Sequence, residues 1–161
     1  MAQGNRTWTP AETRLIAEYL AARWPGRRTM QRVRVGRLHP DLVVPGISEE
    51  EQQSLGVWRR WVDAVIFDPP RILLVEGAIK PDPGDVSQLE LYMHLWPTTP
   101  EFVEFQDWPV QGLLVYAIDD PIIRRLAGAR GFLLEIFSPP WIADYLLKQL
   151  PRNRRAPLTV I

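Results

Sequence analysis

Two acidic residues lie within segments that are otherwise apolar. Asp63 falls in the segment Arg59 to Phe67 and Glu76 in the segment Ile72 to Lys80, and both segments are typical of β-strands. The Pro-Pro sequence between them predicts a turn, so the two strands form a hairpin. If Phe67 pairs with Ile72, the register places Asp63 directly opposite Glu76.

Alternation along each strand places the two acids on defined faces. On the first strand the face consists of Trp61, Asp63, Val65 and Phe67, and on the second of Leu74, Glu76, Ala78 and Lys80. Directly opposed side chains have Cβ atoms about 5 Å apart, and like charges at that distance destabilise a sheet. A shared Mg²⁺ or Mn²⁺ ion would compensate for the repulsion, because hard oxygen ligands suit such cations. The alternative is that one acid is protonated or pairs with Arg59 or Arg60.

A helix follows the second strand. Pro81 to Gly84 breaks the chain, Asp85 is the predicted N-cap, and an apolar period runs from Val86 to Trp96. Gln88 and Tyr92 are one turn apart within the apolar arc of this helix, so both need hydrogen-bond partners. A capping box between Asp85 and Gln88 is the structural alternative for Gln88.

These residues together resemble the PD-(D/E)XK nuclease superfamily, and most closely its RecB-type branch. The resemblance rests on Asp63 in one strand, Glu76 in the next, the nearby Lys80, and a QxxxY helix formed by Gln88 and Tyr92. It covers about half of the chain. It implies a restriction-endonuclease-like α/β core, in which a mixed central sheet is flanked by helices. It also implies that Asp63 and Glu76 hold Mg²⁺, that Lys80 is catalytic, that Gln88 and Tyr92 complete the site, and that DNA is the partner.

The lysine position departs from the family pattern. The family places Lys two residues after the acid on the same face, where this chain has Ala78. Lys80 is the next residue on that face, about 6.7 Å further along the strand. In another alignment, Ala78-Ile79-Lys80 is the motif without its acid. Two functions are therefore expected: a catalytically degenerate structural component of a larger assembly such as a viral particle, or an active Mg²⁺-dependent DNA nuclease.

The first helix has a clear beginning. Thr9 is the predicted N-cap, Pro10 the first helical residue and Glu12 the capping-box partner. Members of the resembling superfamily often carry an acid of the first helix beside the metal site, and Glu18 is the residue that could match it. The alternative is a solvated ion pair between Glu18 and Arg14, four residues earlier.

A basic segment follows the first helix. Residues 23–37 contain six Arg and no acid, and Thr29 to Val35 is typical of a strand. Arg28, Arg32 and Arg34 could contact a phosphate backbone, since guanidinium groups match phosphate geometry. A charged edge strand that resists aggregation explains the same pattern.

The second half of the chain continues the alternation of strands and helices. The sequence predicts a strand at Val110 to Ile118, a helix at Pro121 to Ala127, a buried strand at Gly131 to Phe137, a helix ending at Leu150, and a basic tail at 151–161 with a strand at Leu158 to Ile161. Asp119 and Asp120 precede a proline, which favours helix capping over metal binding.

Composition limits the remaining classes. The 161 residues suit one domain, 1–161, and the absence of Cys excludes disulfides and thiolate metal sites. The formal net charge is zero, so any nucleic-acid binding must come from local patches. No apolar run approaches the roughly 20 residues of a membrane span, and no signal-peptide pattern occurs. We therefore expect a protein of the cytoplasm or of a viral particle, with protein partners and no membrane partner.

Overall fold

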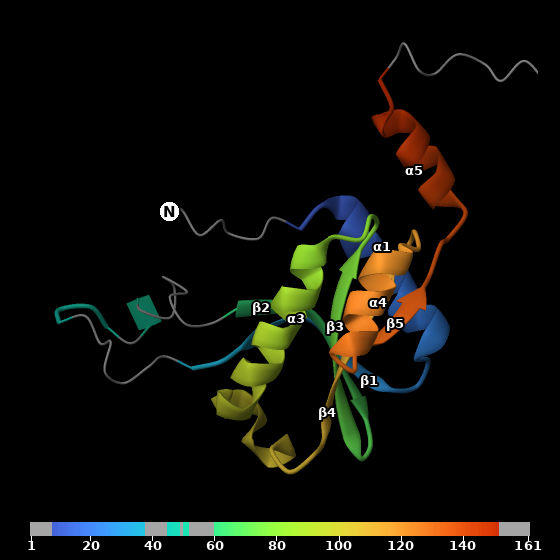
Figure 1. The fold of residues 1–161 in the computed structure, drawn as a ribbon. Coiled ribbons are helices and arrows are strands. Elements are labelled where there is room, and N and C mark those ends of the chain that lie inside the picture. Colours follow the sequence, from blue (N-terminus) through green and yellow to red (C-terminus); the bar gives the residue numbers. More distant parts are fainter. Residues whose placement is uncertain (1–7, 38–44, 49, 52–59, 152–161) are drawn as a thin grey trace, which may run out of the picture.

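A computed structural model describes residues 8–37, 45–48, 50–51 and 60–151 (Figure 1). Its strands are β1 (Arg28–Val35), β2 (Arg60–Asp68), β3 (Arg71–Ala78), β4 (Val110–Tyr116) and β5 (Leu133–Ile136). Its helices are α1 (Pro10–Arg23), α3 (Pro83–Leu95), α4 (Pro121–Ala129) and α5 (Trp141–Gln149), with short 3-10 helices η2 (Trp96–Thr98) and η3 (Pro100–Phe105). The predicted tail strand at Leu158 to Ile161 and residues 152–161 of the basic tail lie outside the described residues, as does Arg59.

The strands form one five-stranded mixed sheet in the order β1-β2-β3-β4-β5. The pairs β1–β2 and β2–β3 are antiparallel, whereas the pairs β3–β4 and β4–β5 are parallel. Parallel neighbours need a crossover, which α3 and α4 supply. In the β2–β3 hairpin Phe67 pairs with Ile72 and Ala64 with Val75, which confirms the predicted register over these residues. The expected fold class, an α/β fold with a mixed sheet flanked by helices, is confirmed.

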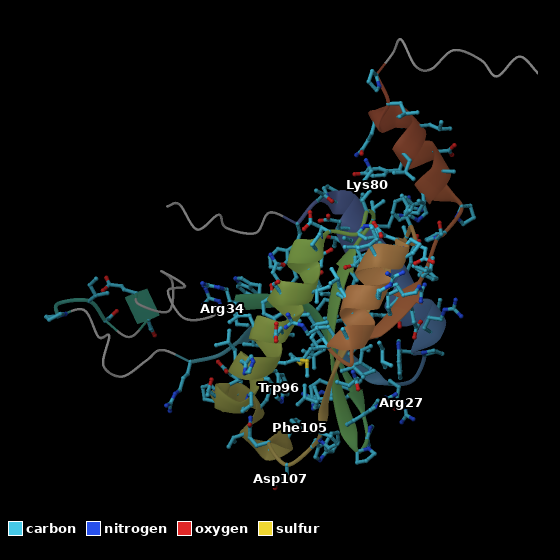
Figure 2. All side chains as sticks on the ribbon, viewed as in Figure 1. Arg27, Arg34, Lys80, Trp96, Phe105 and Asp107 are labelled. Carbon is cyan, nitrogen blue, oxygen red and sulfur yellow. The ribbon has the colours of Figure 1, made fainter. Side chains whose placement is uncertain are left out.

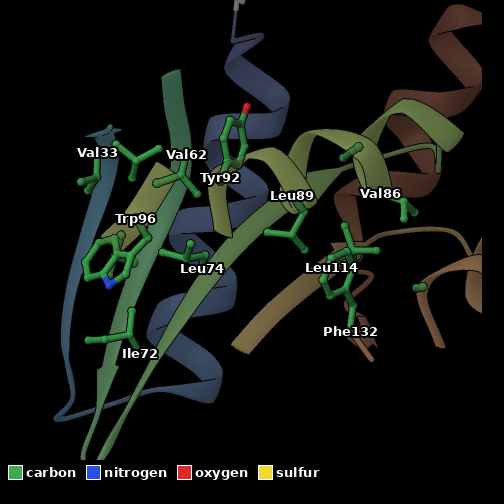
Figure 3. Close-up of a cluster of buried hydrophobic side chains, with 14 of the residues drawn as sticks. Val33, Val62, Ile72, Leu74, Val86, Leu89, Tyr92, Trp96, Leu114 and Phe132 are labelled. Atoms are coloured by element: carbon green, nitrogen blue, oxygen red, sulfur yellow. The ribbon is translucent and has the colours of Figure 1, made fainter. Parts of the chain in front are cut away.

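Helices cover both faces of the sheet (Figure 1). The α3-side cluster lies between the sheet and the helices α3 and α4, and its strand residues include Val33, Val62, Val65, Ile72, Leu74, Ala78, Leu114 and Tyr116 (Figure 3). The α1-side cluster consists of Ile16, Tyr19, Leu20, Ala64, Ile66, Leu73, Val75, Leu113 and Val115. Since both faces of β3 are covered, its side chains are buried from Ile72 to Ala78.

The C-terminal elements are less enclosed than the sheet centre. Ile142 is buried on α5, where it packs in a small cluster with Leu15 of α1. The strand expected at Gly131 to Phe137 is present as β5, but it is only four residues long, and its expected burial is wrong because Leu133 is exposed. The reason is its position at the edge of the sheet, where it pairs with β4 on one side.

Helix starts follow local capping chemistry. The predicted capping box of Thr9 and Glu12 at α1 is confirmed, and Asp120 caps α4 as predicted. The prediction for α3 is wrong: Asp82 is its N-cap and Asp85 is the N3 partner. The helix begins earlier than expected because Pro83 is well suited to the first helical position. Gln88 is therefore not part of the capping box.

Gly112 of β4 leaves room for side chains from two other elements. A Cβ atom at this position would lie 2.8 Å from Cδ1 of Phe132 and 2.9 Å from Cδ2 of Leu89. Both side chains are buried, so neither can move freely. We expect Gly112→Ala to lower the free energy of unfolding by about 1 to 2 kcal/mol through overpacking. Urea denaturation measures this loss, and Gly128→Ala, at a helical site with open space, should show none of it.

No helix in the described ranges is both long and apolar enough to cross a membrane.

Candidate functional site

The alternation of side chains along β2 breaks at Asp63. Val62 packs in the α3-side cluster, whereas Ala64 packs in the α1-side cluster, although residues two apart in a regular strand share a face. On β1, Arg32 lies between the positions paired with Val62 and Ala64 and has a φ of 53°. Such a left-handed conformation is unusual for an Arg and marks a local irregularity of the ladder. The expectation that Asp63 shares a face with Val65 is therefore wrong.

The Asp63 carboxylate is engaged by two hydrogen-bond donors. Its Oδ1 accepts a hydrogen bond of 2.6 Å from Nε1 of Trp8, and its Oδ2 accepts one of 2.8 Å from the backbone N–H of Gly77. The residue is 5% exposed. The small pocket beside it is lined by Trp8, Glu12, Thr13, Ile16, Gln31, Arg32 and Asp63. Asp63 thus joins the segment before α1 to the end of β3, on the side of the sheet that α1 covers.

Glu76 belongs to the other face. The strand β3 alternates regularly, so Glu76 shares its face with Leu74 and Ala78 of the α3-side cluster. The next residue, Gly77, faces α1, because a Cβ atom there would lie 2.3 Å from Cδ1 of Ile16. Glu76 is fully buried. The two acids therefore lie at the same end of neighbouring strands, but their side chains are directed toward different helices.

Further carboxylates lie on the α3 side. Asp85, at the start of α3, is buried, and Tyr116 of β4 is fully enclosed. Burial raises the pKa of the Tyr116 hydroxyl above its ordinary value, and the negative charges of Asp85, Glu76 and Asp82 raise it further. Glu76 thus lies in a region that already carries negative charge.

Asp63 and Glu76 are the two acids that the resemblance implies as metal ligands, and they lie at the same end of the neighbouring strands β2 and β3. Both oxygens of Asp63 already accept hydrogen bonds from the protein, and Glu76 is on the opposite face. Among the described residues, no group of three or more His, Cys, Asp or Glu side chains is placed to hold a metal ion. Magnesium usually binds proteins through one or two carboxylates and keeps several water ligands.

Lys80 is not on the side of Glu76 either. It follows the end of β3, is exposed, and lines a cavity of about 200 Å³ with Glu12, Ile79, Tyr145 and Gln149. Figure 2 shows Lys80 at the end of the molecule from which α5 extends. Ala78, at the family's lysine position, is buried in the α3-side cluster. The structure therefore brings no lysine to the place that the resemblance implies.

The two residues of the QxxxY pattern have different environments. Tyr92 is 3% exposed and lies with Val62 and Leu89 in the α3-side cluster, as Figure 3 shows. Gln88 is exposed, so its expected place within the apolar arc is wrong. The buried residues Val86 and Leu89 set the rotation of α3, and this rotation turns Gln88 toward solvent.

Glu18 connects two helices. Its Oε1 forms an ion pair of 2.9 Å with Nε of Arg14, as predicted, and its Oε2 accepts a hydrogen bond of 2.7 Å from Nε1 of Trp141. The hydrogen bond from Trp141 lowers the pKa of the Glu18 carboxyl most, and the hydrogen bond from Arg14 lowers it further. Glu18 therefore links α1 to α5.

Each of the three Arg that were candidates for phosphate contact stacks on an aromatic ring. The guanidinium carbon lies 4.3 Å from the Phe67 ring centroid for Arg28, 4.8 Å from Trp8 for Arg32, and 4.8 Å from Trp61 for Arg34. The sequence patterns predict no role for Trp8. Its position directly before the N-cap of α1, where apolar residues often pack back on the chain, was the available signal.

No protein-family model matches the chain, and no curated protein sequence matches it. Among solved structures, a repair endonuclease from Pyrococcus abyssi aligns with a TM-score of 0.49 and 19% identity, over 85% of this chain and 50% of that chain. The structure of an EndoMS–dsDNA complex aligns with a TM-score of 0.49 and 17% identity, over 86% of this chain and 50% of that chain. The chain therefore spans about half the length of these two similar structures.

Proposed function

We propose that this protein has a nuclease-like fold without a hydrolytic centre, and that it serves as a DNA-contacting structural component of a larger assembly, such as a viral particle. The observation that carries the proposal is the engagement of Asp63. Its two oxygens accept hydrogen bonds from Trp8 and Gly77, so this carboxylate fastens the chain together. A carboxylate in that role is stabilised by the protein itself, so it needs no bound cation to offset its burial.

The lysine position supports the same proposal. A hydrolytic centre of this class needs a positive charge near the reacting phosphate, and losing such preorganised electrostatic help costs a factor of roughly 10² to 10³ in rate. Ala78 supplies no charge, and Lys80 lies by the cavity near α1 and α5. The missing charge and the different directions of the two acidic side chains each lower the expected activity.

Partners are proposed from two surfaces. The basic residues of β1, with no acid between residues 23 and 37, suit the phosphate groups of DNA. Exposed apolar side chains on α4 and β5, namely Ile122, Leu126 and Leu133, suit a protein partner in an assembly.

The test combines a cleavage assay with thermal unfolding in the presence of metal. We expect no cleavage of supercoiled plasmid by the wild-type protein with Mg²⁺ or Mn²⁺. We also expect millimolar metal to leave the melting temperature unchanged, because only a ligand that binds the folded state raises it.

The opposite result has a defined form. Cleavage that requires metal, together with a metal-dependent rise in melting temperature that Asp63→Asn abolishes, would overturn the proposal in favour of an active Mg²⁺-dependent nuclease. Asp119→Asn is the matched control, because it makes the same change at an exposed carboxylate.

A further inference from the structure

Four side chains form a continuous row at one end of the sheet, with two indole rings in the middle and a guanidinium group at each end. Arg32 stacks on Trp8, Trp8 meets Trp61 edge to face with ring centroids 5.8 Å apart, and Arg34 stacks on Trp61. We call these four residues, Arg32, Trp8, Trp61 and Arg34, the Arg–Trp ladder. They come from three places in the chain: the segment before α1, the strand β1 and the strand β2.

The backbone explains how the ladder forms. Arg34 pairs with Trp61 across β1 and β2, so the two side chains lie next to each other on one face. The left-handed conformation of Arg32 breaks the alternation of β1. Because of this break, Arg32 and Arg34 both reach the α1 side, where Trp8 is held by its hydrogen bond to Asp63.

The ladder is accessible to a ligand. Trp61 is 37% exposed, Arg32 is exposed, and Trp8 and Arg34 are half-buried. Trp side chains are highly buried on average, so an exposed indole ring often marks an interaction site. Figure 2 shows Arg34 at the edge of the molecule, well separated from Lys80.

The chemistry of the ladder suits one class of ligand. A guanidinium that stacks through its flat face keeps its in-plane N–H groups for hydrogen bonds, and these match phosphate oxygens. Arg32 uses one such group on Thr13, at 2.7 Å. Indole rings provide surfaces on which bases stack.

Local charge favours an anionic partner. The segment 23–37 has six Arg and no acid, whereas the whole chain is neutral. Two acids line the pocket beside Trp8 and Arg32: Asp63 is buried with two donors facing its oxygens, and Glu12 accepts a hydrogen bond from the Thr9 N–H in the capping box of α1. A strand of phosphates therefore meets positive charge at this surface although the net charge of the protein is zero.

We propose that the Arg–Trp ladder binds single-stranded DNA, with unpaired bases stacked at Trp61 and Trp8 and phosphates held by Arg32 and Arg34. Unpaired bases are required, because a duplex keeps its base faces stacked inside the helix. This inference rests on the proposed function in one respect, that DNA is the partner. It adds the form of the DNA, the surface that binds it and the residues that do so.

The experiment measures fluorescence anisotropy of a labelled oligodeoxynucleotide of about 15 nucleotides, within the usual site size of single-strand binders. The same oligonucleotide annealed to its complement is the second probe. We expect the wild-type protein to bind the single strand more tightly than the duplex. We expect Trp61→Ala to weaken binding of the single strand about fivefold to hundredfold, as is typical for the loss of one stacking platform.

Variants separate stacking from charge. Trp61→Phe keeps an aromatic ring and should retain most of the affinity, which a merely structural effect of truncation would not predict. Arg34→Gln should reduce the slope of log K against log salt concentration by about 0.7, the value for one phosphate contact to a single strand. Arg125→Gln, which removes one charge from the exposed face of α4, should change neither the affinity nor the slope by a comparable amount.

Three outcomes would overturn the inference. They are equal affinity of the wild-type and Trp61→Ala proteins for the single strand, equal losses from Arg34→Gln and Arg125→Gln, and tighter binding of the duplex than of the single strand. Circular dichroism and thermal unfolding of each variant verify folding. The cleavage assay is independent of these measurements, so failure of the ladder inference does not change the result that tests the absence of a hydrolytic centre.

Discussion

Asp63→Ala is expected to lower the free energy of unfolding by about 3 kcal/mol, because each buried donor left without an acceptor costs about 1 to 3 kcal/mol. The two donors concerned are Nε1 of Trp8 and the backbone N–H of Gly77. Removal of a buried negative charge offsets part of this loss. For a chain of this size the melting temperature should fall by about 6 to 12 °C. Urea denaturation and calorimetry, both without metal, measure the two quantities.

The sign of the Asp63→Asn effect distinguishes a fastening residue from a metal ligand. An amide oxygen can accept from one of the two donors, while the amide NH₂ group faces the other, so we expect a loss of stability without metal. A metal ligand that repels a second carboxylate would behave oppositely, and its Asn variant would be more stable than the wild type without metal. Asp119→Ala is the matched control, because Asp119 is an exposed partner of Arg124 and such pairs contribute little. If the Asp63→Asn variant is more stable than the wild type, Asp63 does not fasten the chain through its hydrogen bonds from Trp8 and Gly77.

Ala78→Lys is expected to destabilise the protein and to leave it without nuclease activity. The family pattern has Lys at this position, so in a nuclease that had lost only this charge the substitution would restore cleavage. Here Ala78 is buried against the α3-side cluster, and a longer, charged side chain must displace neighbours or extend to solvent. The expected loss is about 2 to 3 kcal/mol, from overpacking and burial of a charge.

Two measurements bear on the Ala78→Lys prediction. Thermal unfolding gives the stability, and the plasmid assay with Mg²⁺ and Mn²⁺ gives the activity. Ala17→Lys, the same change at an exposed position of α1, should alter the free energy of unfolding by no more than about 0.5 kcal/mol. Metal-dependent cleavage by Ala78→Lys would show that the hydrolytic centre lacks one component only, contrary to our proposal.

Local patterns in the sequence were sufficient for much of the fold. Thr9, Pro10 and Glu12 fixed the start of α1, because capping depends on residues close together in the chain. The turn after Phe67 fixed the hairpin register through Ala64 and Val75, since a short turn leaves few ways to pair two strands. The predicted pairing of Arg14 with Glu18 followed from helical spacing in the same way.

The candidate site could not be read from local patterns. Strict alternation placed Asp63 with Val65, whereas the direction of its side chain depends on the irregularity at Arg32 and on a hydrogen bond from Trp8. These residues are 31 and 55 positions away, so no spacing rule connects them to Asp63. Gln88 was misplaced because the rotation of α3 is set by packing on the sheet.

The irregularity at Arg32 also affects what the protein can associate with. β1 and β5 are the two outer strands of the sheet, and a long regular outer strand is a template on which further strands assemble into aggregates. The left-handed residue in β1 interrupts the regular spacing of its backbone groups, and its Arg side chains add charge. At the opposite edge, β5 is only four residues long, so it offers few backbone groups with which a further strand could pair. An open five-stranded sheet thus has two margins that are poorly suited to edge-to-edge growth.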